Sequence, residues 1–429
     1  MDASPPPPIR PRKPRRRWRW HVPPALTHGG ESLEGAPVLD EVQGPLGLVL
    51  WETYRDVVLW SGTEERDGLF AAGAHAARLR ELDAAGADPA LDRALRGAAA
   101  VVADPVGTQE ADVMGACRQA ADWAEQRGLM GTAVTLATAA ALASPTNAAA
   151  AFRVGQIARS KGENARAETW FRRAIGLGRQ AKDWASYAEA FLGLGNLYKL
   201  RGNFPQARRF HIRALRAARR HALRDIVARA LHDLFTIAVE TSPPAEAQDL
   251  ARLAFRAYGP RHAKLPALAH DVAYFWVGQG RFAPALDVFR AVMPHLAEPG
   301  ERLLCAGNLG RAAGALGDRP TFEEAWEQVW ASPEEWDKQS KAGQALLELA
   351  HGASSLRDWG RAEKAAEAGR DLAQKRGQGQ VVILSDTVLE AARRKRGTEI
   401  PASAGDAAED TQDLAADFVR SLRTGAGMR

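Results

Sequence analysis

Four arginines recur at spacings of four, three and four residues in the stretch ARRFHIRALRAARRH, residues 207–221; they are Arg209, Arg213, Arg216 and Arg220. At 3.6 residues per turn these spacings place all four side chains on one face of a helix, opposite the apolar residues of the stretch. Guanidinium groups bind carboxylates and phosphates, so this basic patch could hold an acidic protein or a nucleic acid. The solvated outer face of a helix explains the same pattern.

Other residue types that could do chemistry are scattered. His211 and His221 lie ten residues apart, and we expect surface or half-buried histidines there rather than a metal site. Carboxylate pairs such as Glu323 and Glu324 fall on expected solvent faces. The sequence has no Walker loop, Gly-x-Ser-x-Gly, His-Glu-x-x-His or Cys-x-x-Cys motif. We therefore predict no catalytic residues, metal ligands or cofactor, and a protein that is not an enzyme and has no small-molecule substrate.

The net positive charge of the chain comes from its N-terminus. Residues 1–30 hold seven basic residues and one acidic residue, whereas the net charge of the whole chain is +5. The segment RPRKPRRRWRW, residues 10–20, could stack on bases or lie at a membrane surface. It could also be a solubilising tail or follow a misassigned start codon. Because no apolar signal segment or membrane span is found and Cys117 and Cys305 lack partners, we expect a cytoplasmic protein.

A repeated pattern of small residues organises most of the 429-residue chain. Equivalent positions fall at residues 121, 155, 195, 232, 273, 310 and 350, with steps of 34 to 41 residues. In most copies a Gly follows seven residues later and a small residue five after that, as in LGNLYKLRGNFPQA at 194–207. A small residue allows close approach of a second helix, and Gly permits the turn between them. A period of this length predicts an array of helical hairpins.

This pattern resembles the tetratricopeptide repeat, through LGNLY at 194–198 and Ala207 and Ala214. The longer period resembles an extended form of the repeat found in bacterial regulators and in eukaryotic scaffold proteins, and a composition rich in Ala, Arg and Gly suggests a bacterial source. The resemblance implies an all-α fold, a right-handed superhelical array of antiparallel helix hairpins (an α-solenoid) with a helical N-terminal cap. One copy has Val239 in place of the turn Gly, and the copy at 310 has a shifted second helix.

The parts of the chain follow from these patterns. We expect a Pro- and Arg-rich disordered tail over 1–37, a helical cap over 38–109 and the repeat array over 110–378. A terminal capping helix should cover 379–396, and a linker with a short acidic helix should cover 397–429.

The resemblance also implies a peptide-binding groove lined by the first helix of each repeat. The residues implied for this groove are Arg153, Gln156, Arg159, Asn196, Lys199, Arg229, Asp233, His270, Tyr274, Asn308 and Arg311. Amides can bond a peptide backbone, and Arg and Lys can bond carboxylates. Polar residues that merely face solvent would give the same list. Only Asn196 fits the Lys–Asn carboxylate clamp of the chaperone-binding members, so that specificity is not transferred.

Two functions remain open at this point. The first is a non-catalytic scaffold or adaptor that binds another protein or peptide, acidic ones included, in its concave groove. The second is a regulator that contacts nucleic acid or membrane through the basic tail and the Arg-rich helix, with the repeats as its sensor. The acidic C-terminal helix, around Leu414 and Phe418, could also occupy the strip near Asn196 and Lys199 in place of the ligand.

Overall fold

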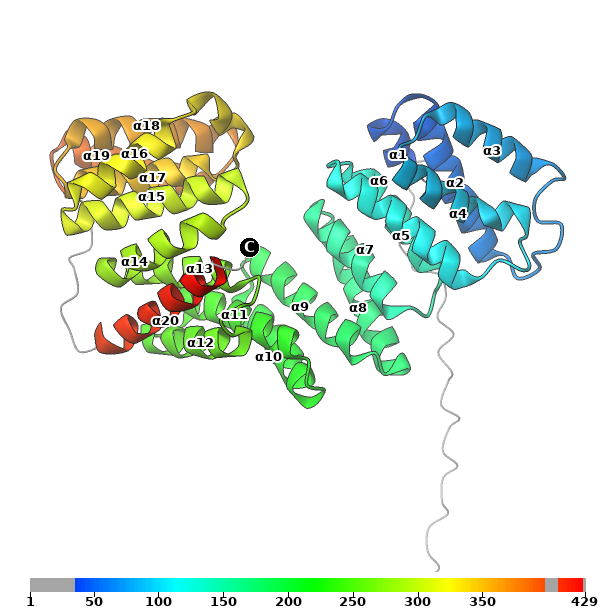
Figure 1. Ribbon diagram of the computed structural model, residues 1–429, viewed down its shortest axis with the longest axis horizontal. Coiled ribbons are helices and arrows are strands. Elements are labelled where there is room, and N and C mark those ends of the chain that lie inside the picture. The colour runs from blue at the N-terminus through cyan, green and yellow to red at the C-terminus, as the bar shows by residue number, and fades with distance from the viewer. Residues whose placement is uncertain (1–34, 398–407, 427–429) are drawn as a thin grey trace, which may run out of the picture. The chain divides into compact units, whose positions relative to one another are not determined.

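The structure is a computed structural model that describes residues 35–397 and 408–426. These residues form helices, with no strand among them (Figure 1). The expected all-α array of helix hairpins is confirmed. The chain divides into two compact units, with the division between Ser186 and Tyr187 in the sequence, and each unit is described by itself. The tail with its Arg and Trp residues lies outside the described residues, and the handedness of the superhelix stays a prediction.

Unit 1 consists of eight described helices, α1 to α8, and has an apolar core formed by α2, α4, α5 and α6. Its helices are α1 (Ala36–Glu41), α2 (Gly44–Gly62), α3 (Ala74–Ala85), α4 (Pro89–Ala103), α5 (Glu110–Gln126), α6 (Met130–Ala143), α7 (Ala148–Ser160) and α8 (Asn164–Ala181). Trp60 of α2 is fully buried with residues of α4, α5 and α6, and its indole N–H donates to the Pro105 carbonyl at 2.7 Å. Helices α1–α4 therefore cover the apolar face of the first hairpin, α5–α6, as a cap must.

Helix α1 has a specific role at the start of α6. The residue before α6 is Leu129, whose side chain cannot accept a hydrogen bond. The Glu41 carboxylate at the end of α1 accepts instead from the backbone N–H groups of Gly131 and Thr132, both at 2.7 Å. A carboxylate at a helix N-terminus satisfies free N–H groups and the helix dipole together. Helix α1 begins at Ala36, so it includes the last two residues of the segment predicted as the tail.

Unit 2 continues the hairpins and ends in two extra helices. After α9 (Trp184–Leu200) come α10 (Phe204–Arg220), α11 (Arg224–Thr241), α12 (Pro244–Tyr258), α13 (Leu265–Gly278), α14 (Phe282–Val292), α15 (Pro299–Leu316), α16 (Arg319–Trp330), α17 (Ala342–Ser355), α18 (Trp359–Lys375), α19 (Gly379–Arg393) and α20 (Ala408–Ala426). Short 3₁₀ helices cover Met293–His295 and Pro333–Lys338. The second of these follows α16, where the sequence shows its shifted copy.

The turns and close contacts use the residues that the repeat pattern singles out. Gly162 and Gly202 adopt left-handed backbone angles, with φ of 87° and 70°, directly before α8 and α10. Gly155 faces the ring of Phe171, and a Cβ added there would lie 2.6 Å from its Cδ1 atom. Gly195 faces the residue at the same spacing, His211. A side chain at either glycine would therefore collide with the second helix of its hairpin.

Helices α15 and α17 show how closely two first helices of successive hairpins can approach in this chain. A Cβ on Gly307 would lie 2.8 Å from the Cα of Ala345, and one on Gly314 would lie 2.5 Å from the Cα of Gly352. The backbones are therefore in direct contact along this pair, which leaves no room for a ligand between them. Helices α5 and α7 of unit 1 have no such glycine pairing, and they stand further apart.

Candidate functional site

A cavity with a volume of about 540 Å³ lies in unit 1, lined by residues of α5, α6 and α7. The apolar part of its lining consists of four alanines, Ala137, Ala140, Ala149 and Ala150, with Met114 and Phe152. Alanine side chains end at Cβ, so the space beside them stays unfilled. The volume is in the range of sites that hold small ligands or peptide side chains.

The polar wall of this cavity is held by one arginine. Nη2 of Arg153, on α7, donates to the Asp122 carboxylate at 2.7 Å and also to Glu125, both on α5. Its Nη1 lies 3.4 Å from Oε1 of Gln156. Burial acts to lower the pKa of Arg153, but the hydrogen bonds to the two carboxylates raise it overall. Arg153 is therefore a fixed cation that positions Gln156 at the cavity edge.

Two of the three groove residues predicted in this unit line the cavity, and one does not. Arg153 and Gln156 are lining residues, whereas Arg159 lies further along α7, with its Nε buried and without a hydrogen-bond partner. Asp122, Glu125 and Arg118 also line the cavity, and sequence reasoning did not select them. Asp122 and Glu125 precede Arg153 by about the length of one short repeat. Opposite charges at that spacing in the sequence are the signal that indicates them.

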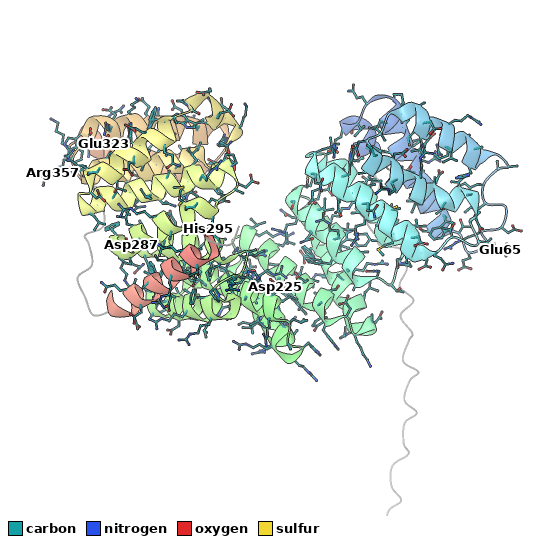
Figure 2. All side chains as sticks on the ribbon, in the orientation of Figure 1. Glu65, Asp225, Asp287, His295, Glu323 and Arg357 are labelled. Carbon is teal, nitrogen blue, oxygen red and sulfur yellow. The ribbon has the colours of Figure 1, made fainter. Side chains whose placement is uncertain are left out.

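In unit 2 the predicted groove residues bond mainly to side chains within the chain, and most of these side chains lie on neighbouring first helices. Nζ of Lys199, on α9, donates to Oγ1 of Thr236 at 3.1 Å and lies 3.7 Å from the Asp233 carboxylate, both on α11. Asn196 is half-buried one turn before Lys199. Arg229 of α11 pairs with Glu189 of α9 and, at 2.8 Å, with Asp225. Asp225, labelled in Figure 2, also pairs with His262.

The same lateral bonding continues from α11 to α15. Nε2 of His232 pairs with the Asp271 carboxylate at 3.0 Å, and the neighbouring His270 lies 3.6 Å from the other Asp271 oxygen. The Asn308 amide donates to Nε2 of His270 at 3.1 Å. Burial acts to raise the pKa of Asp271, but the hydrogen bonds from the two histidines lower it well below its usual range. His270 and Asn308 are therefore buried links between helices and not exposed peptide ligands.

The last links of this series join α13 and α15 to α17. The Glu348 carboxylate, only 2% exposed, accepts from Arg311 at 2.7 Å and from the Tyr274 hydroxyl at 3.1 Å. The nearby carboxylate, together with burial, raises the pKa of Tyr274 above its usual range. Tyr274 is 39% exposed, so part of its side chain still reaches the surface.

We call this series the inner ladder. Its charged members are five carboxylates and three cations: Glu189, Asp225, Asp233, Asp271 and Glu348 against Lys199, Arg229 and Arg311. Its bonds join side chains on successive first helices, about one repeat apart in sequence. Because the cations are neutralised within the chain and carboxylates are in excess, the ladder gives no support to the expectation of an acidic partner in unit 2.

The basic patch lies on the outer side of α10. Arg209, Arg213, Arg216 and Arg220 are exposed. The guanidinium group of Arg213 lies 5.8 Å from the centre of the Phe191 ring. His211, on the same helix, is fully buried rather than half-exposed as expected, and neither of its ring nitrogens has a hydrogen bond.

The acidic C-terminal helix does not occupy the inner side, contrary to the placeholder hypothesis. Helix α20 packs on α14, and Phe418 contacts Phe255 of α12 with ring centres 4.9 Å apart (Figure 1). Asp410 pairs with Arg252 of α12 at 2.7 Å. The apolar stripe of α20, with Leu414 and Phe418, is buried where the helix packs on these second helices.

Two further observations bear on chemistry. Burial raises the pKa of the Cys117 thiol to about 12, so this thiol stays protonated near neutral pH.

Among the helices within 35–397 and 408–426, none combines the length and the apolar character needed to cross a membrane.

Comparison with known proteins supports the repeat assignment. Residues 146–220, which include α7 to α10, match the tetratricopeptide repeat family, so the resemblance drawn from the sequence is confirmed and this part of the chain consists of tetratricopeptide repeats. No curated protein matches the sequence significantly.

Solved structures resemble the chain only distantly. The apo form of RapI shares 13% identity over 66% of this chain and 98% of its own, with a TM-score of 0.44. The Rap conjugation gene regulator of plasmid pLS20, in complex with the Phr* peptide, shares 13% over 88% and 98%, with a TM-score of 0.45. PilF from Pseudomonas aeruginosa shares 16% over 55% and 97%, with a TM-score of 0.41. At these values the likeness carries no information about ligands.

Proposed function

We propose that the protein is a non-catalytic interaction module that binds a segment of a partner protein, and that the unit 1 cavity receives an apolar side chain of that segment. The observation that carries the proposal is the unit 1 cavity, with its alanine lining and its fixed polar wall. Proteins of the tetratricopeptide repeat family commonly act as interaction modules. The cavity is lined partly by residues of the matched region and partly by residues that precede it.

The cavity offers both kinds of contact that an extended peptide needs. An apolar side chain gains about 25 cal/mol for each Å² of apolar surface that it buries against the alanine lining. The peptide backbone can bond the side-chain amides of Gln156 and Asn147, which sit at the rim. Asn147 uses only its oxygen to cap α7, by accepting from the Ala150 N–H at 3.0 Å, so its N–H groups remain for a ligand.

Preorganisation favours binding at this site. Since Asp122 and Glu125 hold the Arg153 side chain from the facing helix, the wall loses little side-chain freedom when a ligand arrives. In the inner ladder the side chains are bonded in the same way, but α15 and α17 are in direct backbone contact and leave no space for a ligand between them. The cavity is therefore the better candidate of the two surfaces.

Peptide selection with hydrogen exchange tests this function. A random seven-residue peptide library is selected on the full-length chain, and exchange is then measured with and without the enriched peptides. We expect slower exchange in residues 110–126 and 147–160. The proposal fails if no peptide is enriched, or if protection is confined to the helices of the inner ladder.

A further inference from the structure

Helix α10 and its flanks form a segment of one charge sign. Between Ala190 and Arg224 the sequence has nine Lys or Arg residues and no Asp or Glu, and six of the nine are arginines of α10. Surface helices usually carry both signs, because pairs three or four residues apart stabilise the helix. Helix α18 of the same unit does so, with the Arg370 guanidinium 3.9 Å from the carboxylate of Glu367, three residues before it. Because α10 has no carboxylates, it lacks such stabilising pairs within the helix. Helix stability therefore does not explain its six arginines.

The structure leaves the four arginines of the basic patch available. Arg209, Arg213, Arg216 and Arg220 are all exposed, and no ion pair is found for them among the described residues. The arginine next to them, Arg208, points elsewhere and pairs with Glu246 of α12 at 2.6 Å. Since α10 rises about 1.5 Å per residue, the four side chains form a straight row about 16 Å long.

The surroundings of this row decide what kind of polyanion suits it. Within α10, which the structure describes in full, every large apolar side chain is at least partly covered, and the helix exposes none. A folded protein partner would need an apolar centre to its interface, and a membrane would need an apolar face to insert. The phosphate backbone of a nucleic acid needs neither, because its binding is mainly electrostatic.

We propose that the outer face of α10, through Arg209, Arg213, Arg216 and Arg220, binds the phosphate backbone of a nucleic acid duplex. Guanidinium groups match phosphate oxygens with two parallel hydrogen bonds, and a straight row follows a regularly charged strand. The contact carries no base reading, since the row presents only cations. This surface lies on the opposite side of α10 from its packing against α9 and α11, and it is independent of the unit 1 cavity.

The test compares two triple variants of the full-length chain, both of which keep the basic tail. The first is Arg209→Gln, Arg216→Gln and Arg220→Gln, which leaves Arg213 on its aromatic neighbours. The control is Arg302→Gln, Lys375→Gln and Arg423→Gln, three exposed helical cations with the same total charge change. Circular dichroism must first show equal helix content. Fluorescence anisotropy then measures binding of 20-base-pair mixed-sequence DNA and RNA duplexes over a salt series.

We expect the α10 variant to bind the duplexes on the order of tenfold more weakly at low salt than the control, with a salt slope smaller by about two to three. A larger loss on one duplex than on the other identifies the natural backbone. Equal duplex binding by both variants overturns the proposal. It is also overturned if the α10 variant loses binding to polyglutamate, or to vesicles with anionic lipid, and keeps its duplex binding.

Discussion

Gly195 of α9 lies directly against the imidazole of His211 on α10, so that a Cβ on this glycine would be 2.7 Å from Cδ2 of the ring. His211 is fully buried and cannot move aside. We therefore predict that Gly195→Ala destabilises the protein by about 1–3 kcal/mol through overpacking. The urea midpoint of unfolding measures this, with Gly115→Ala as the control. Gly115 is also in a helix interior but has open space around it, so alanine there should stabilise by about 0.5–1 kcal/mol. Equal effects at the two sites would show that the close contact is absent.

His211 should also make stability depend on pH. Burial lowers the pKa of its imidazole, a shift that Lys199 reinforces and Asp233 opposes. In the unfolded chain the imidazole of His211 becomes protonated near pH 6.5, whereas in the folded protein it stays neutral to a lower pH. The free energy of unfolding therefore falls as the pH drops below about 6.5. The ring of Phe171 occupies the matching position beneath Gly155, so His211→Phe should fit. Thermal unfolding between pH 7.5 and 5.5 should show a smaller loss of Tm for this variant. The same loss in both proteins would rule out a role for His211.

The buried end of the inner ladder should respond strongly to the loss of one charge. Replacing Arg311 by Met leaves the Glu348 carboxylate buried with only the Tyr274 hydroxyl beside it, so we expect a loss of about 3–5 kcal/mol in unfolding free energy. The double variant Arg311→Met with Glu348→Met should recover most of that loss, because it buries no unpaired charge. If the double variant is less stable than Arg311→Met alone, the Arg311–Glu348 ion pair contributes more free energy to folding than its desolvation costs.

Glu41 should stabilise the start of α6 from a distance of ninety residues in sequence. Glu41→Ala removes the acceptor for the Gly131 and Thr132 N–H groups, so unit 1 should lose about 1 kcal/mol, as for the loss of an N-cap. Native-state hydrogen exchange is the suitable measurement, with faster exchange expected at the first turn of α6. Glu110→Ala, at the start of α5, changes the same charge without a cap to lose. An unaltered α6 would mean that water satisfies these N–H groups.

Much of the fold could be predicted from the sequence because the repeat pattern is made of close contacts. Gly155 and Gly195 recur at the repeat spacing since each must face a ring on the next helix, and the turn glycines Gly162 and Gly202 recur for their backbone angles. The position of α20 could not be predicted, because its apolar stripe fits any apolar gap. Which apolar surface it covers is decided by the packing of distant helices, α12 and α14, and no local pattern encodes that.

The candidate site was predicted only in part. Arg153 and Gln156 were selected by their place on the first helix, and both line the cavity. The cavity itself arises where small alanine side chains leave space unfilled, and no sequence motif marks such a position. In unit 2 residue type alone could not distinguish a free cation from one bonded to the next repeat, as Arg229 is to Glu189.

Blocking the cavity tests the central claim most directly. Ala149 is exposed, lines the cavity and is the second residue of α7, so Ala149→Trp should fill the site without disturbing the fold. Ala111, the exposed second residue of α5, does not line the cavity, and Ala111→Trp is the matched control. The dissociation constant of an enriched peptide is measured by calorimetry for both variants and for the unaltered protein. The account predicts at least tenfold weaker binding for Ala149→Trp, a loss of about 1.4 kcal/mol, and an unchanged constant for Ala111→Trp. Equal affinity of the two variants for the peptide would contradict it.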